Sequence, residues 1–239
     1  MSTWPRQRVL TLIAIALTFA SGAADVTSFT RLGNVFTSVM TGNIVLWGLA
    51  VARGSLTLAS HTAVAVGGYI AGVAVGTWVA RGFKEDEPSQ DAVLPSHVIW
   101  VLLAELTLLA GFAAGWEVSG ASPAGWAQFS LLATLAAAMG VQSSAVNDMG
   151  LTQVSTTYLT GTLTGLVSSL VSPGQDTPHG GRRFGVLIGL VAGASLCGLF
   201  VATAADVVPA LPLAALVATL VLATGPGWRP ARLRRRKER

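Results

Sequence analysis

The sequence predicts an all-α, polytopic membrane protein, and three observations support that prediction. Charged residues make up only 11% of the 239 residues, against about 25% in an ordinary soluble domain. Hydrophobic residues make up 52%, and the mean hydropathy is +0.63. The apolar residues form continuous runs, such as 101–114 and 129–139, whereas a transmembrane β-strand alternates apolar and polar positions. These features exclude a soluble enzyme, which needs more polar surface, and a disordered chain.

Eight hydrophobic segments are candidates for membrane helices, since a span needs about 20 mostly apolar residues. The second and sixth are the weakest, and the sixth is rich in serine and threonine. If these two are re-entrant, the chain crosses the membrane six times; if they cross, it crosses eight times. We therefore expect a helical bundle of six to eight spans in a single transmembrane domain, residues 1–239. The segments are 9–30, 34–52, 59–80, 97–116, 126–146, 153–171, 184–205 and 209–224.

The first segment has the layout of a secretory signal. Arg6 and Arg8 precede an apolar run, and small residues follow at 20–23. We expect the segment to remain as the first span, because an internal repeat begins there, with G-x2-D at 22–25 approximating G-x2-S at 140–143, and requires the helix before it.

The basic residues predict that both termini are cytoplasmic. Seven of the 15 lysines and arginines lie in a basic tail, residues 225–239, which leaves 8 basic and 10 acidic residues elsewhere. Eight spans would place twelve basic residues on the side of the termini and three opposite, whereas six spans would place thirteen and two. The positive-inside rule gives the same orientation in both cases, so it does not choose between them. A basic tail beside a hydrophobic segment marks the cytoplasmic side more often than it binds nucleic acid, so we expect the lipid bilayer, and no nucleic acid, as a partner.

The two halves of the chain resemble each other across a polar loop at 84–96. The pattern V-x-T-x3-T-G-N at 35–43 matches V-x-T-x3-T-G-T at 154–162, with an offset of 119 residues. Downstream, the pattern G-x3-G at 68–72 recurs at 189–193. Pseudo-symmetric halves are common among transporters. The two repeats cover about residues 9–116 and 126–224. With four spans in each repeat the two halves would have the same orientation in the membrane, and with three spans in each they would have opposite orientations.

Short motifs in both halves of the chain resemble those of a known family. Residues 22–29 read GAADVTSF, and residues 33–43 read GNVFTSVMTGN; Gly140-Val-Gln142 and Thr160-Gly161-Thr162 follow in the second half. Together they resemble the YoaK-like, DUF1275 family of bacterial membrane proteins. The resemblance implies a six-span inner-membrane protein of unknown function, so it favours the re-entrant option and supplies no substrate.

The two Thr-Gly motifs are the first candidate site. Glycine and asparagine are poor helix formers, so we expect them to interrupt a helix inside the membrane. The freed amides and carbonyls could then coordinate an ion or a small anion. Close helix packing with interhelical hydrogen bonds explains the same residues equally well. The residues are Thr41, Gly42 and Asn43 in the first half and Thr160, Gly161 and Thr162 in the second.

Three other polar residues lie within apolar segments. Glu105 is near the middle of 97–116, where a charge costs several kcal/mol unless it faces the bundle interior or is neutral. It could carry a proton for transport or form a structural hydrogen bond. Asp25 lies near the end of the first segment, where a wet mouth or a helix-end role is at least as plausible as a buried site. Gln142 could face a polar cavity or bridge two helices.

Small-xxx-small faces allow close approach of two helix backbones. We interpret two glycine series as packing or dimerisation faces, which would permit a homo-oligomer. The series are Gly68, Gly72 and Gly76, and Gly185, Gly189 and Gly193.

We expect a transporter or channel for a small molecule or ion, with its site between the two Thr-Gly motifs. The alternative is a structural or regulatory membrane protein that transports nothing and acts through its glycine faces. An enzyme is not expected, because no nucleophile–base set is present and the three histidines and single cysteine lack metal-ligand spacing. We therefore predict no catalytic residue, no metal and no cofactor.

Overall fold

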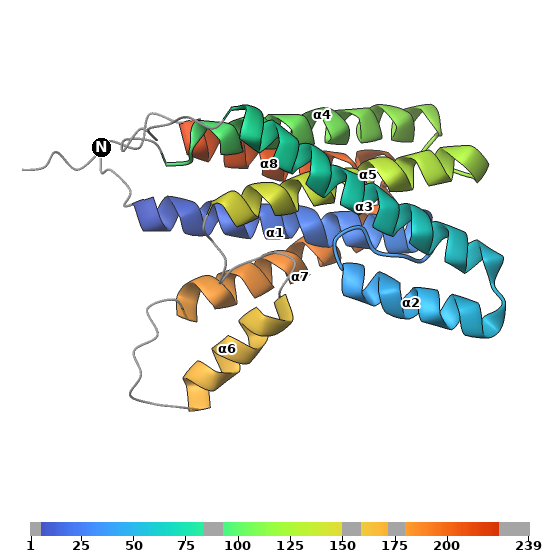
Figure 1. Cartoon of the computed structure of the whole chain (residues 1–239), viewed down its shortest axis with the longest axis horizontal. Coiled ribbons are helices and arrows are strands. Elements are labelled where there is room, and N and C mark those ends of the chain that lie inside the picture. The colour runs from blue at the N-terminus through green and yellow to red at the C-terminus, as the bar shows by residue number, and fades with distance from the viewer. Residues whose placement is uncertain (1–5, 84–92, 150–158, 172–179, 225–239) are drawn as a thin grey trace, which may run out of the picture.

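The computed structural model describes residues 6–83, 93–149, 159–171 and 180–224, so the basic tail at 225–239 and most of the predicted loop lie outside the described residues. The regular structure of the described ranges is entirely helical, which confirms the all-α class. Figure 1 shows the arrangement. The helices are α1 (Arg6–Arg31), α2 (Met40–Arg53), α3 (Leu56–Gly82), α4 (Ser96–Val118), α5 (Gly125–Asp148), α6 (Leu159–Val171), α7 (Gly180–Thr203), a 3-10 turn (Ala205–Val207) and α8 (Ala210–Thr224).

Six of the described helices are long and apolar enough to cross a membrane: α1, α3, α4, α5, α7, and α8 with the 3-10 turn before it. α2 has 14 residues and α6 has 13. At 1.5 Å per residue each is about 20 Å long, well short of a hydrocarbon core of about 30 Å. Within the described residues the structure therefore favours six spans: the second predicted segment forms a half-length helix, and the described part of the sixth, residues 159–171, is equally short. Residues 150–158, which begin the sixth segment, lie outside the described ranges.

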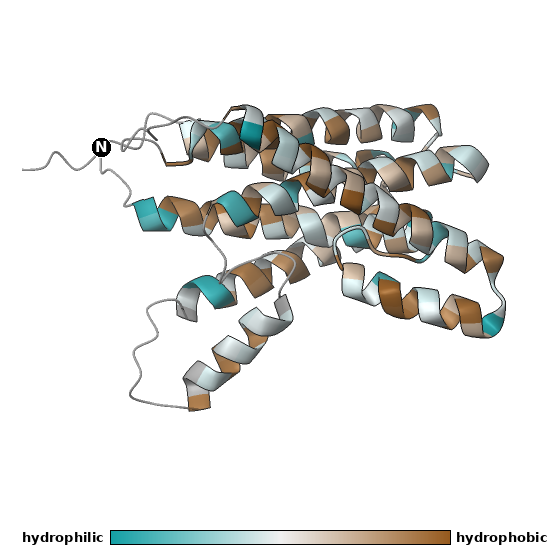
Figure 2. Cartoon of the chain, in the orientation of Figure 1, coloured by the Kyte–Doolittle hydropathy of each residue, from teal (hydrophilic) through white to brown (hydrophobic). Residues whose placement is uncertain are grey.

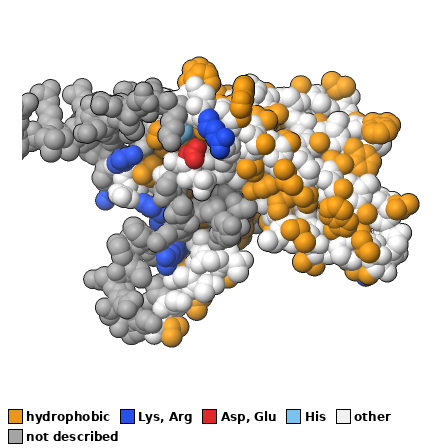
Figure 3. Space-filling model, viewed as in Figure 1, with side chains coloured by type: hydrophobic (Ala, Val, Ile, Leu, Met, Phe, Trp, Pro, Cys, Tyr) orange, Lys and Arg blue, Asp and Glu red, His pale blue; other side chains and the backbone are white. Residues whose placement is uncertain are grey.

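The charged side chains mark the two ends of the bundle. Apart from Asp25 and Glu105, every charged residue of the described ranges lies in the first or last turns of a helix or in the 3-10 turn. Figure 2 shows the hydrophilic residues towards the ends of the helices, with apolar residues between them. In Figure 3 the visible basic and acidic side chains gather at the end where α1 begins, and hydrophobic side chains spread over the remaining face. This distribution matches a bundle whose middle is surrounded by lipid.

Four helices enclose the apolar core. α8 packs against both α1 and α4, and α4 packs against α5. Fully buried Leu17, Leu102, Phe112, Leu135 and Leu216 fill the space between them. α1 begins and α8 ends at the same end of the bundle (Figure 1), so the N- and C-terminal helices share a side.

Glycines allow two helix pairs to come close together. A Cβ added to Gly72 on α3 would clash with the Ala137 carbonyl on α5, and one added to Gly140 on α5 would clash with the Tyr69 carbonyl on α3. On the other side of the molecule, a Cβ added to Gly193 on α7 would clash with the Phe19 carbonyl of α1. Backbone contact of this kind requires a residue without a side chain.

The other glycines of the two predicted faces also point at neighbouring helices. Gly68 and Gly76 face Ala133 and Ser144 of α5, while Gly185 and Gly189 face Ile15 of α1. Both glycine faces are therefore occupied within the chain itself.

Cysteine labelling tests the six-span arrangement. Arg53 and Arg81 lie near opposite ends of α3. With cytoplasmic termini, six spans place Arg53 outside and Arg81 inside, and eight spans reverse both. We expect Arg53→Cys, but not Arg81→Cys, to react with an impermeant maleimide added to intact cells. The native Cys197 is buried, so the wild-type protein is the background control and should not be labelled. Labelling of Arg81→Cys but not of Arg53→Cys would contradict six spans.

Candidate functional site

The chain turns back on itself after α1 instead of continuing into a second span. The turn falls at Gly33 and Asn34, which have φ values of 106° and 60°. The segment after the turn then runs back along α1, where the Ser28 hydroxyl donates to the Val35 carbonyl at 2.8 Å. We call residues 32–39 the re-entrant segment. It is irregular backbone that lies beside α1 rather than beyond its end.

Asp25 anchors the re-entrant segment. Its Oδ1 accepts hydrogen bonds from the amides of Thr37 and Ser38, both at 2.8 Å, and from the Thr37 hydroxyl at 3.2 Å. Its Oδ2 accepts one from the Ser38 hydroxyl at 2.6 Å. The side chain is only 8% exposed, and no ion pair to it occurs among the described residues. Asp25 is therefore a largely buried acid whose two carboxyl oxygens accept hydrogen bonds from neutral donors.

Asn43 fixes the other end of the same segment. Its Oδ1 accepts from the Phe36 amide at 2.9 Å, and its Nδ2 donates to the Phe36 carbonyl at 2.6 Å. Asn43 is fully buried, so the side chain acts as a clamp on one backbone residue. Irregular backbone survives at membrane depth only where its polar groups are satisfied in this way.

The helix interruption lies upstream of the place that the sequence predicted. Thr41, Gly42 and Asn43 belong to the first turn of α2, and the interruption is the re-entrant segment before them. Thr41 is exposed on the outside of this turn. In the second half, Thr160 and Gly161 are likewise exposed in the first turn of α6, and Thr162 is buried. The residues that precede α6 lie outside the described ranges.

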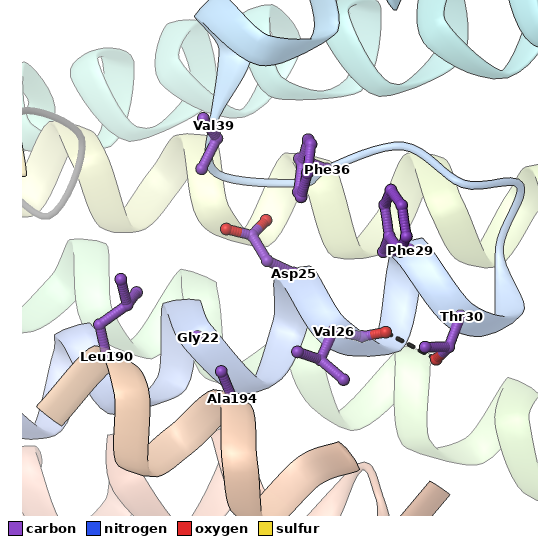
Figure 4. Close-up of a pocket in the computed structure, with 9 residues that line it drawn as sticks. All are labelled: Gly22, Asp25, Val26, Phe29, Thr30, Phe36, Val39, Leu190 and Ala194. Carbon is purple, nitrogen blue, oxygen red and sulfur yellow. Dashed lines mark hydrogen bonds between the residues drawn. The ribbon is translucent and has the colours of Figure 1, made fainter.

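A cavity of about 310 Å³ opens between α1, the re-entrant segment and α7. Figure 4 shows Phe29 and Phe36 on one wall, with the Asp25 carboxylate pointing towards the chain between Phe36 and Val39. The two phenyl rings stack with their centroids 5.3 Å apart. Most of the wall is apolar, and among the described residues that line it Asp25 is the one that carries an ionisable group. The lining residues are Gly22, Asp25, Val26, Phe29, Thr30, Phe36, Val39, Leu190 and Ala194.

Glu105 and Gln142 lie elsewhere, in the packed core. Glu105 is fully buried on α4, and neither of its carboxyl oxygens has a hydrogen-bond partner among the described residues. Gln142 on α5 donates to the Leu17 carbonyl at 3.2 Å and to the Ser21 hydroxyl at 2.8 Å, both on α1. Neither residue lines the cavity, so the candidates predicted from the sequence occupy at least two places.

Several residues of this site were not predicted. Thr37 and Ser38 supply the donors to Asp25, and α7 contributes Leu190 and Ala194 to the cavity. Thr37 and Ser38 lie a few residues before the predicted motif Thr41-Gly42-Asn43. Their position beside that motif could have identified them from the sequence. The contribution of α7 depends on contacts between residues more than 160 positions apart, such as Gly22 and Leu190, and a single sequence does not contain that information.

Comparisons with known proteins agree on a membrane family. A family model described as "Protein of unknown function (DUF1275)" matches residues 13–224. The curated "UPF0700 transmembrane protein YoaK" of Bacillus subtilis (strain 168) is 31% identical over 160 residues, which cover 67% of this chain and 66% of that protein. The match thus spans just under two thirds of the relative's length. No solved structure matches the chain at a significant level.

Proposed function

The chain belongs to the DUF1275 family, and on this premise we propose that it is a transporter or channel for a small organic cation. It is an integral membrane protein. The proposed location is the bacterial cytoplasmic membrane, with the lipid bilayer as its surroundings and both termini in the cytoplasm.

The interrupted span beside a cavity is the observation that supports transport. Transporters commonly place their substrate sites at discontinuous helices, because unwound backbone is tolerated in a membrane only inside protein or along a water-filled path. Here the interruption is the re-entrant segment, and α2 is the half-length helix that follows it. The cavity contacts the segment at Phe36 and Val39. Because Thr41 is exposed outside the cavity, the proposed site is the segment before the first Thr-Gly motif rather than the motif itself.

An inverted repeat is part of this proposal. α1 and α5 are each followed by a half-length helix, α2 and α6, and then by a long glycine-lined helix, α3 and α7. α3 packs on α5 through Gly72, and α7 packs on α1 through Gly193, so the two closest helix pairs correspond. Gly140 of α5 and Gly22 of α1 meet backbone of α3 and α7 in matching ways. Each half then has three spans, α1, α3 and α4 in the first and α5, α7 and α8 in the second. Because three is odd, corresponding helices of the two halves run in opposite directions across the membrane.

The cavity limits the size and polarity of the solute. About 310 Å³ holds about ten non-hydrogen atoms, if each takes the ~30 Å³ of a water molecule in the liquid. A neutral, apolar molecule of this size crosses a bilayer unaided, so a protein path with apolar walls is useful to a solute that also carries charge. Asp25 offers the opposite charge, and the faces of Phe29 and Phe36 can attract a cation. Asp25 Oδ2 has one donor among the described residues, the Ser38 hydroxyl, which a cation can displace.

The alternative, a structural or regulatory protein that binds others through glycine faces, has less support. Those faces are covered inside the chain, as the clashes at Gly72 and Gly193 indicate. They are therefore not free to receive a second protein.

Uptake of labelled tetraethylammonium into proteoliposomes tests the proposal. This impermeant cation has nine non-hydrogen atoms and fits the cavity, whereas the much larger tetraphenylphosphonium does not. We expect wild-type uptake at least about fivefold above protein-free liposomes. Ala194→Leu, which fills the cavity and leaves Asp25 untouched, should reduce uptake to the background.

The matched control is Asp148→Asn, which removes an exposed carboxylate at the end of α5. It should transport as the wild type does. Transport by Ala194→Leu at the wild-type rate would contradict the proposed site. Wild-type uptake no greater than that of protein-free liposomes would contradict transport of a small organic cation.

A further inference from the structure

Among the described residues, Glu105 is a buried acid with neither a counter-ion nor a hydrogen-bond donor. It lies ten residues into α4, is fully buried, and accepts no hydrogen bond from the described residues. An ionised carboxylate left without donors or a counter-ion in an apolar interior costs many kcal/mol, so such a group takes up a proton instead. Asp25, by contrast, has four donors. The two buried acids of the bundle thus have opposite surroundings.

The helices around α4 offer Glu105 no charge partner. α3, α5 and α8 pack against α4. α8 has no titratable residue between Ala210 and Thr224, and α5 has only Asp148, at its last position. α3 carries His61, Tyr69 and Arg81, none of which makes an ion pair or hydrogen bond with Glu105 within the described part of the chain.

Gln142 has the opposite deficiency, an acceptor without a donor. Its Oε1 is buried and has no partner among the described residues, although Nε2 donates to Leu17 and Ser21. The amide cannot simply be flipped, because the Leu17 carbonyl only accepts hydrogen bonds and must face the nitrogen. Gln142 therefore needs one donor, and a protonated carboxyl has one donor to give.

The register of α4 and α5 places these two groups at the same depth. A Cβ added to Gly115 would lie 2.8 Å from Leu131 Cδ2, which aligns these two positions of the antiparallel pair. Ten residues back from Gly115 is Glu105, and ten residues on from Leu131 is Val141, the neighbour of Gln142. Both helices rise about 1.5 Å per residue, so the acid and the amide lie at about the same level of the interface.

We propose that Glu105 is a proton-binding site and that its protonated carboxyl donates to Gln142 Oε1. When the proton leaves, the O–H bond breaks with its electron pair kept by the carboxylate, and the proton passes to water. A change at the α4–α5 interface that separates Glu105 from Gln142 removes the acceptor and favours this release.

The same amide connects the proton site with the cavity. Gln142 donates to Ser21 on α1, which precedes Gly22 and lies four residues before Asp25, and both of these line the cavity. Residues i and i+4 share a helix face. Resting on the proposed function, the inference is that a proton on Glu105 and an organic cation in the cavity are exchanged across the membrane, because Gln142 is hydrogen-bonded to the helix that lines the cavity and, in this proposal, also accepts from the protonated Glu105.

Infrared spectroscopy of the purified protein in nanodiscs at pH 7 tests the proton site without any solute. We expect a C=O stretching band of a protonated carboxylic acid that disappears in Glu105→Gln. The band should move to higher frequency in Gln142→Leu, which removes the acceptor. Asp148→Asn should leave it unchanged. Labelling all glutamates with ¹³C should shift the band, which assigns it to glutamate even if Glu105→Gln does not fold.

Different outcomes identify different errors. No protonated band in the wild type, or a band that shifts with ¹³C-glutamate and persists in Glu105→Gln, overturns the proton site. A band that stays in place in Gln142→Leu overturns the pairing with Gln142. Coupling is measured separately, because tetraethylammonium uptake should respond to a pH gradient in the wild type and lose that response in Glu105→Gln. If the band is present and no uptake occurs, the proton site stands and the proposed function fails.

Discussion

Replacing Gly72 by alanine is expected to destabilise the fold strongly. The new methyl group would lie 2.0 Å from the Ala137 carbonyl oxygen on α5, and backbone cannot rotate away as a flexible side chain can. α3 and α5 would have to separate along their whole contact. We expect a loss of at least about 3 kcal/mol in unfolding free energy, the upper end of the cost of overpacking a core. The measurements are the unfolding midpoint in detergent and the monodisperse fraction in size-exclusion chromatography.

The chain provides a matched control in the same helix. Gly67 precedes Gly68 on α3, is exposed, and has no atom within 4 Å of an added Cβ. Gly67→Ala should leave stability unchanged or raise it by up to about 1 kcal/mol, because alanine is the better helix former. Gly193→Ala should behave like Gly72→Ala, since it meets the Phe19 carbonyl on α1. Equal stability of the variants at positions 67 and 72 would contradict the described α3–α5 contact.

Removing the Asp25 carboxylate is expected to release the re-entrant segment. Asp25→Ala leaves the buried amides of Thr37 and Ser38 without an acceptor, and each such orphan costs about 1–3 kcal/mol. We expect a loss of about 3–5 kcal/mol, and a smaller loss for Asp25→Asn, which retains one acceptor. Hydrogen exchange followed by mass spectrometry should show faster exchange in peptides covering residues 32–43, while α4 and α5 remain protected.

Asp148→Ala is the control, because it removes an exposed carboxylate at a helix end. Its stability should lie within about 0.5 kcal/mol of the wild type. If Asp25→Ala exchanges at the wild-type rate in residues 32–43, the carboxylate does not hold the segment and its role must be sought elsewhere.

The sequence was sufficient for the class of fold, because continuous apolar runs and the scarcity of charge are direct consequences of a lipid environment. It was also sufficient to single out Glu105, since an acid in the middle of an apolar run stands out without any structure. It could not locate the interruption correctly. Glycine and asparagine at 42 and 43 are poor helix formers, yet Asn43 sits in a helix because its side chain clamps Phe36 seven residues earlier.

The sequence indicated that the second segment is weak and could be re-entrant, but it did not show where α2 begins. Its apolar residues have the composition of a span, and only the turn at Gly33 and Asn34 shortens it. The role of Asp25 depends on contacts with residues 12 and 13 positions later, across that turn. Local propensity could not anticipate these contacts, because the tertiary arrangement decides which backbone amides need an acceptor.

The short second helix has a consequence for how the protein is made. A 14-residue helix is too short to cross the hydrocarbon core by itself, so we expect α2 to enter the bilayer together with α3, as a hairpin joined at Gly54. Until then the bare amides of Thr37 and Ser38 have no acceptor in lipid. The carboxylate of Asp25, already synthesised on α1, is the first group able to receive them. We therefore expect α1 to be in place before the hairpin docks, with Asp25 as the group that receives the amides of Thr37 and Ser38.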